Sequence, residues 1–262
     1  MTVKGFVMAV AVPEIKFPEG KLPENNETSR AKGRLHDSFI WHRLHSASGI
    51  FPIGFFLLQH LLANSYALRG AAAYNTVIKV YGNLPFVAVL EVVLIYVPIL
   101  YHSIYGIWIT AYGQSNLTKY QYGRNWMYFL QRISGVIAFF YIGYHIWNTS
   151  LQKYVLLWHH DPDPERVIRY AAMAHQMADP LHFAIQAIGI IATVFHFTNG
   201  LWNFCIRWGL TISAHSQRMN QYACWSLFFI FAGMGLWSIA HLRADGLRGT
   251  GTASPTVVAM RH

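Results

Sequence analysis

Charged residues are scarce in this sequence. Asp, Glu, Lys and Arg make up only 12% of its 262 residues, about half the share of roughly 25% found in soluble domains. Hydrophobic residues make up 54%. This composition excludes a disordered chain and a collagen-like fibre, and it argues against a soluble globule, which would need more charge to cover its surface. A membrane protein with several spans remains.

Cysteine is nearly absent. Cys205 and Cys224 are too few for a disulfide scaffold or for an iron–sulfur cluster, which takes four ligands, and we interpret both as small apolar side chains. Acidic residues are also few, and the net charge is +9. Because no basic stripe lies on a soluble face, the excess of Lys and Arg points to lipid headgroups and membrane topology rather than to nucleic acid.

The apolar residues fall into blocks long enough to cross a bilayer, which takes about 20 residues. The sequence therefore predicts an all-α membrane protein with five transmembrane helices. A polar N-terminal arm (1–40) precedes the membrane domain (41–241), and a polar, glycine-rich tail (242–262) follows it. Pro52 and Pro98 lie inside spans and predict local kinks. The expected spans are 46–68, 84–111, 126–150, 181–208 and 216–241.

The distribution of basic residues predicts the orientation. The arm and the second and fourth connections carry 12 of the 20 Lys and Arg residues, and the opposite side carries the other 8. Since cytoplasmic segments are the richer in Lys and Arg, the N-terminus is expected in the cytoplasm and, after five spans, the C-terminus outside.

Histidine is abundant, with 14 residues against 11 Asp and Glu. His60, His102, His145 and His196 each lie deep inside a different span, where ionisable groups are costly and usually functional. His45 and His241 stand at span ends. We interpret the remaining eight as solvated side chains of the arm, loops and tail: His36, His42, His159, His160, His175, His182, His215 and His262.

Depth pairs the four deep histidines. At a rise of about 1.5 Å per residue, His60 and His145 lie roughly 21 and 28 Å from the cytoplasmic ends of their spans, hence in the outer half. His102 and His196 lie roughly 27 and 22 Å from the outer ends of theirs, hence in the inner half. Zinc, copper or di-iron sites would want further ligands. Two imidazoles facing each other across a bundle suit a haem with two axial histidines. The sequence therefore predicts two haems, held in a haem-binding bundle that four of the five helices form.

Small residues follow the same spacing. Gly106 and Gly200 each stand four residues after a deep histidine, in a repeated His-x-x-x-Gly-φ-Trp pattern, and so share its helix face. Gly49 precedes His60 by 11 residues, while Ser134 and Gly135 precede His145 by 11 and 10. These positions leave room for a porphyrin at the inner level, although small residues also serve helix packing in membranes.

These motifs resemble the dihaem cytochrome b membrane anchor of the succinate:quinone oxidoreductase family, in its single-chain, five-helix type that occurs with menaquinone. The resemblance covers roughly residues 40–241. The segments that carry it are RLHSASGIFPIGFFLLQHLLAN, LPFVAVLEVVLIYVPILYHSIYG, YGRNWMYFLQRISGVIAFFYIGYHIWNT and TVFHFTNGLWNFCIRWGLTIS.

The resemblance implies a subunit that performs no succinate chemistry itself. Its partners would be a FAD flavoprotein and an iron–sulfur subunit on the cytoplasmic side of a bacterial inner membrane. Electrons would pass through two b haems, ligated by His102 with His196 (inner) and His60 with His145 (outer), to a quinone, in this type menaquinone. Val194 stands where some fumarate reductase relatives carry a Glu, so a transmembrane proton route at that position is not expected.

The quinone site is less determined. Glu91 is the only carboxylate well inside a span, 11 residues before His102, and could relay protons for quinone reduction or simply bond near the headgroups. Gln59, Asn64, Arg69 and Gln186 are candidates to contact the quinone or haem propionates on the outer side. The inner candidates are Arg43, His45, Ser46, Gln131 and Arg132.

Two alternatives stay open at this point. The chain could be the dihaem anchor of another quinone-linked oxidoreductase, such as a fumarate reductase, hydrogenase or formate dehydrogenase. It could also be a transporter whose histidines relay protons without haem.

Overall fold

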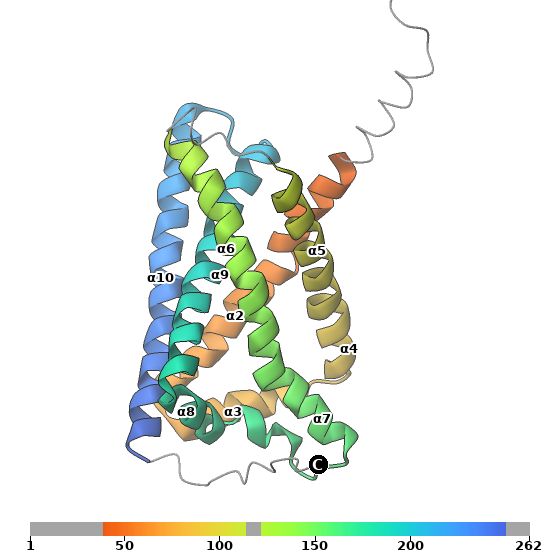
Figure 1. Ribbon diagram of the computed structural model, residues 1–262, viewed down its shortest axis with the longest axis vertical. Helices are drawn as coiled ribbons and strands as arrows, with labels where there is room; N and C mark the ends of the chain where they lie inside the picture. The colour runs from red at the N-terminus through yellow and green to blue at the C-terminus, as the bar shows by residue number, and fades with distance from the viewer. Residues whose placement is uncertain (1–38, 114–121, 250–262) are drawn as a thin grey trace, which may run out of the picture. The chain divides into compact units, whose positions relative to one another are not determined.

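The structure is a computed structural model that describes residues 39–113 and 122–249 (Figure 1). The arm predicted for 1–40 lies almost wholly outside these residues, as does the tail from 250. Contacts divide the chain after Trp41. Residues 39–41 are helical.

All regular structure in the described residues is helical, which confirms the all-α prediction. Residues 42–50 are helical, and the later elements are α2 (Ile53–Ser65), η1 (Tyr66–Arg69), α3 (Ala71–Gly82), α4 (Val87–Glu91), η2 (Val92–Tyr96), α5 (Val97–Tyr112), α6 (Gly123–Ile146), η3 (Trp147–Leu151), α7 (Gln152–Trp158), η4 (Pro164–Ile168), α8 (Tyr170–Ala178), α9 (Pro180–Arg207) and α10 (Ala214–Leu247).

Four helical stretches among the described residues are long and apolar enough to cross a membrane: Phe39–Arg69, Val87–Tyr112, Pro180–Arg207 and Ala214–Leu247. The third predicted span, 126–150, is helical throughout, within α6 and η3. It does not reach the same hydropathy because it carries polar side chains such as Gln131 and Arg132. The count of five spans therefore stays a prediction.

Two predicted helix ends need correction. The first helix already includes residue 39, seven residues before the expected start at 46. The last continues to Leu247 instead of ending at 241. Helix α8 stabilises this extension, because Arg243 donates hydrogen bonds to the carbonyl oxygens of Met177 and Ala178.

The helical hydrogen bonding is irregular near both intramembrane prolines. Residues 51–52 form a turn between two helical segments, as expected where Pro52 has no N–H to donate. Pro98 lies in the first turn of α5, directly after the π-helical η2. A wide π turn at this point accommodates the missing bond.

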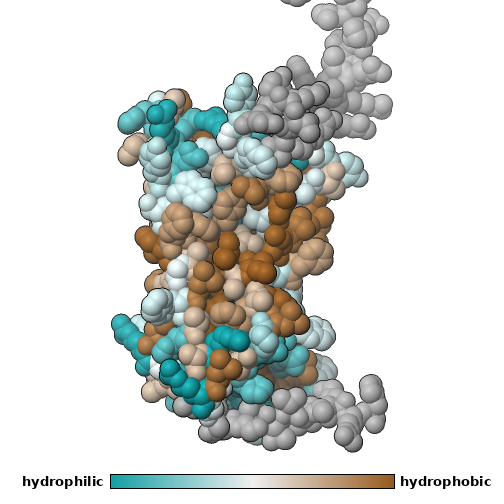
Figure 2. Space-filling model, turned by 60° about the vertical axis from the view of Figure 1, so that its left-hand side comes forward, coloured by the Kyte–Doolittle hydropathy of each residue, from teal (hydrophilic) through white to brown (hydrophobic). Residues whose placement is uncertain are grey.

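The packing centres on α9, which lies against α6 and α10 (Figure 1). The buried apolar core gathers where α8 packs on α10, and it includes Met173, Ala174, Met177 and Leu242. By contrast, none of the residues of α4, η2 and α5 is buried. Figure 2 shows hydrophobic residues across the middle of one face, with hydrophilic residues gathered towards its two ends, the distribution expected of a surface that contacts lipid.

Candidate functional site

The four deep histidines lie in two pairs. His60 on α2 faces His145 on α6, with ring centroids 5.8 Å apart and ring planes at 83°. His102 on α5 faces His196 on α9, with centroids 6.2 Å apart and planes at 89°. Each pair thus joins two helices that are far apart in the sequence.

Both separations suit a single metal ion between two imidazoles. A metal–imidazole nitrogen bond is about 2 Å long and a ring centroid lies about 1 Å beyond its nitrogen, so two ligating rings have centroids roughly 6 Å apart. Each pair could supply two nitrogen ligands, the number that a six-coordinate haem takes from its protein.

Backbone carbonyl groups orient the rings of His102 and His196, the pair predicted to lie at the inner level and called the inner pair here. His102 Nδ1 lies 3.0 Å from the carbonyl oxygen of His45, and His196 Nδ1 lies 3.0 Å from that of Gln131. A carbonyl only accepts, so each Nδ1 carries the proton and each Nε2 keeps its lone pair for a metal. The side-chain amide of Gln131 lies 3.5 Å from His196 Nε2 and donates to the His196 carbonyl oxygen at 3.0 Å.

Serine hydroxyls reinforce this arrangement in a repeated motif. Ser48 Oγ lies 3.2 Å from His102 Nδ1, and Ser134 Oγ lies 3.4 Å from His196 Nδ1. Each serine follows the residue with the accepting carbonyl by three positions. Residues 45–49 and 131–135 therefore make equivalent contacts with two imidazole rings.

The next residue of the motif is a glycine that touches the same ring. A Cβ on Gly49 would lie 2.6 Å from His102 Cε1, and one on Gly135 would lie 2.7 Å from His196 Cε1. Only glycine permits so close an approach. A Cβ on Gly106 would lie 3.1 Å from His45 Cε1, and one on Gly200 would lie 3.4 Å from Gln131 Nε2. All four predicted glycines therefore border the inner pair or the residues that hold it.

The inner polar candidates lie around the same place. His45 stacks on His102 with centroids 4.0 Å apart. His45 Nδ1 and Arg132 Nε are buried and have no hydrogen-bond partner among the residues that the structure describes, so both could bind an anionic group such as a haem propionate. Arg43 lies over the Trp208 ring. Ser46 is half-buried, and it is Ser48, which the sequence analysis did not single out, that reaches the His102 ring.

Of the outer polar candidates, only some contact the His60–His145 pair. Gln186 is 4% exposed and lies 3.4 Å from His145 Nδ1. Asn64 donates to the His60 carbonyl oxygen and accepts from the Tyr74 hydroxyl. Arg69 is exposed and lies over the Tyr66 ring, while Gln59 is half-buried.

Glu91 is joined to α7. Its carboxylate pairs with Lys153 at 3.3 Å and accepts a hydrogen bond from the Tyr154 hydroxyl. Burial, together with this hydrogen bond, raises the pKa of Tyr154. Glu91 thus lies in a small polar cluster close to the predicted outer end of its span.

Two histidines were misjudged from the sequence. His42, expected to be solvated, is half-buried, and its Nδ1 lies 2.9 Å from the Tyr105 hydroxyl. His182, expected to be solvated in a loop, is only 7% exposed in the first turn of α9. It lies 3.3 Å from the amide nitrogen of Gln186 and 2.7 Å from the Tyr144 hydroxyl. Its spacing of four residues from Gln186 was the signal available, since residues i and i+4 share a helix face.

One curated relative matches most of the chain. It is the succinate dehydrogenase cytochrome b558 subunit of Bacillus subtilis (strain 168), 35% identical over 201 residues, which cover 77% of this chain and 95% of the relative. No family model matches the sequence.

Proposed function

Because this chain belongs to the family of cytochrome b membrane-anchor subunits of succinate dehydrogenase, we propose that it binds two b haems and connects the iron–sulfur subunit to a quinone, most simply menaquinone. The membrane-anchor role follows from the relationship. The number of haems, their ligands, the quinone and the sidedness are parts of the proposal.

The observation that carries the proposal is the pairing of four histidines from four helices at 5.8 and 6.2 Å. Bound haems would supply one-electron carriers at an inner and an outer level. His102 and His196 would ligate the inner iron through Nε2, because backbone carbonyls occupy their Nδ1 protons. His60 and His145 would ligate the outer iron.

The surrounding residues have distinct tasks in this proposal. Gly49 and Gly135 let the inner rings lie close to the facing helix backbones. His45 and Arg132 offer unpaired buried nitrogens for propionates, and Arg43 lies at the same end of the helices. On the outer side, the Glu91 carboxylate would supply protons to the quinone as it is reduced, and its contacts with Lys153 and Tyr154 would hold it in place.

The partners would dock at the cytoplasmic side, where the more basic arm and connections are predicted to lie. They are the FAD flavoprotein and the iron–sulfur subunit that a succinate dehydrogenase needs. The curated relative favours this assignment over a hydrogenase or formate dehydrogenase anchor. Co-purified subunits and succinate-dependent quinone reduction would distinguish these complexes.

Reduced-minus-oxidised absorption spectra of the purified complex test the haem assignment. We expect two b-type components. Replacing His60 or His145 with Ala should remove one of them, and replacing His102 or His196 should remove the other. Loss of the same component from the His60 and His102 variants would contradict the pairing, and a spectrum without haem would contradict the function.

Two glycine substitutions test the inner site, one at the His102 ring and one as its matched control. The methyl group of Gly49→Ala would meet the His102 ring at 2.6 Å, so we expect loss or displacement of the inner component alone. Gly143→Ala lies in a helix of the same bundle with nothing within 4 Å of the added carbon and should leave both components unchanged. Equal effects of the two substitutions would argue against a specific inner site.

A further inference from the structure

The two histidine pairs differ in what holds the second ring nitrogen. In the inner pair both Nδ1 atoms lie against backbone carbonyl oxygens. In the outer pair, His145 Nδ1 lies 3.4 Å from the side-chain amide of Gln186. A side chain rather than the backbone thus contacts an outer ligand, and Gln186 itself is 4% exposed.

Gln186 belongs to a small buried network. Its Nε2 also lies 3.3 Å from His182 Nε2, and its Oε1 lies 2.7 Å from the Tyr141 hydroxyl. The Tyr144 hydroxyl lies 2.7 Å from His182 Nδ1, and the backbone N–H of His182 donates to Asp179 Oδ1 at 2.6 Å. The network therefore runs from the start of α9 to the His145 ring.

Metal ligation of His145 fixes the roles in this network. A neutral imidazole that binds iron through Nε2 carries its proton on Nδ1, and this proton needs an acceptor. Of the two ends of the Gln186 amide only the oxygen accepts, and the two ends have nearly the same shape. The Tyr141 hydroxyl can bond to either end because it both donates and accepts.

We propose that Gln186 is a positioning residue for the outer haem ligand. When His145 binds iron, the amide turns so that Oε1 accepts from His145 Nδ1 and His182 Nε2, while its NH₂ group donates to the Tyr141 hydroxyl. His182 then receives its second hydrogen bond from Tyr144. This inference rests on the proposed haem function and adds to it a shared acceptor that adjusts the outer haem.

The shared acceptor has a consequence for the haem potential. A stronger hydrogen bond from Nδ1–H makes the imidazole a more basic ligand, which favours oxidised iron and lowers the midpoint potential. Removing the acceptor should raise the outer potential. Removing His182, the competing donor, should leave the carbonyl to His145 alone and lower the outer potential.

Potentiometric titration of the two haem components in the purified complex tests this inference. Gln186→Leu should shift the outer component to higher potential, and His182→Leu should shift it to lower potential. Neither should move the inner component. Gln176→Leu is the matched control, because Gln176 donates to the Asn148 carbonyl oxygen on the same side without contacting a deep histidine, and it should move neither component.

The opposite signs separate positioning from structural damage, which would shift the outer component in one direction in both variants. Shifts of the same sign, or an outer potential unchanged in either variant, would overturn the inference. If Gln186→Leu does not assemble, a raised or unchanged potential in His182→Leu still overturns it. Failure of the proposed function looks different, because the unmodified complex would then lack two b-type components.

Discussion

At the scale of single residues, the deep histidines differ in how firmly they are held. A backbone carbonyl cannot be removed by substitution, so the anchors of His102 and His196 persist whatever side chains stand at positions 45 and 131. The anchor of His145 is a side chain and can be altered. The outer site is therefore the one whose properties substitution can adjust without displacing its ligands.

The carboxylate of Glu91 is the group proposed to supply protons to the quinone. Glu91→Gln should leave both haem components, the assembled complex and electron transfer from succinate to an artificial acceptor at the flavoprotein unchanged. Quinone reduction should fall by about 10²–10⁴-fold, the usual contribution of a positioned acid–base group. Steady-state quinone reduction by membranes that contain the complex measures this.

Lys153→Gln is the control for Glu91, because it breaks the same ion pair but leaves the carboxylate in place. A proton relay requires the carboxylate, so Lys153→Gln should be much milder than Glu91→Gln. Equal losses in the two variants would identify the ion pair as the important feature. Normal turnover of Glu91→Gln would leave Glu91 a structural residue.

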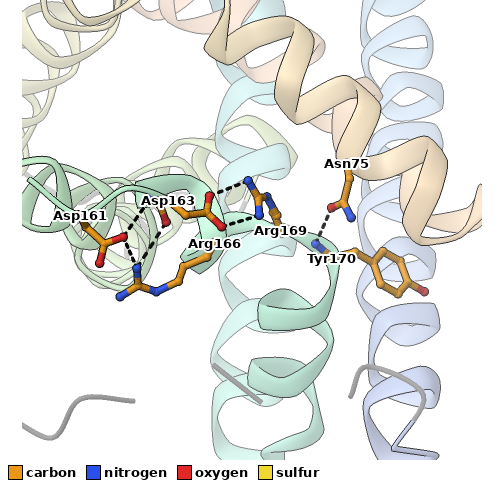
Figure 3. A network of polar contacts seen from close by, with 6 residues as sticks. All are labelled: Asn75, Asp161, Asp163, Arg166, Arg169 and Tyr170. Atoms are coloured by element: carbon orange, nitrogen blue, oxygen red, sulfur yellow. Dashed lines mark hydrogen bonds and ion pairs between the residues drawn. The ribbon is translucent and has the colours of Figure 1, made fainter. Parts of the chain in front are cut away.

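At the scale of elements, α8 illustrates a short helix held by its neighbours. A helix of nine residues is marginal by itself. Figure 3 shows the contacts around its start, where Asn75 on α3 accepts from the backbone N–H of Tyr170 at 3.0 Å, and Arg169 makes two 2.6 Å bonds to Asp163. Asp161 pairs with Arg166, and this bond lowers the pKa of Asp161.

Tyr170 also ties α8 to the end of α10, since its hydroxyl donates to Asp245 at 2.5 Å and its side chain is buried. Tyr170→Phe should destabilise the protein by about 1.5–3 kcal/mol, the usual value for a hydrogen bond to a charged group. Thermal unfolding in detergent should show a midpoint lower by several degrees. The exposed Tyr222 offers a control in Tyr222→Phe, which should leave the midpoint within a degree or so.

The same hydroxyl gives this variant a pH signature. Burial, and then the hydrogen bond to Asp245, raise the pKa of Tyr170 above its usual value of about 10. The unfolded chain loses this proton at a lower pH than the folded one, so the stabilisation is complete below pH 10 and declines above it. Tyr170→Phe should therefore lose less stability between neutral and alkaline pH than the unmodified protein does. A parallel decline in both would argue against the hydrogen bond.

At the scale of the whole molecule, one group of helices packs closely while α4 and α5 leave their apolar side chains exposed. Such a surface is stable in lipid, where apolar side chains need no protein cover. The chain is therefore a multi-pass membrane protein, as the curated relationship also requires.

The orientation of the molecule can be tested by proteolysis. Protease added to right-side-out membrane vesicles should cleave the tail beyond residue 249 and leave the arm 1–40 intact, because the basic side is expected to face the cytoplasm. Immunoblotting with tags at each end measures this, and permeabilised vesicles provide the control. Cleavage of the arm in sealed vesicles would reverse the orientation.

The sequence predicted the helices of this protein better than it predicted the contacts between them. Hydropathy and the spacing of residues along a helix are local properties, so the sequence alone determined the helical class and the glycines at helical spacing from the four histidines. The depth of these histidines in the membrane stays a prediction. The curated relationship confirms the family that these residues indicated. Helix ends were less determined, since the last turn of α10 depends on carbonyl groups of α8.

Only the tertiary structure decided which atoms meet. It brought the carbonyls of His45 and Gln131 to the inner rings, selected Ser48 rather than Ser46, buried His182, and gave Glu91 partners 62 and 63 residues away. These contacts depend on the rotation of each helix about its axis and on its distance from its neighbours. Both are set by packing between segments that are distant in the sequence, which spacing along a single helix does not encode.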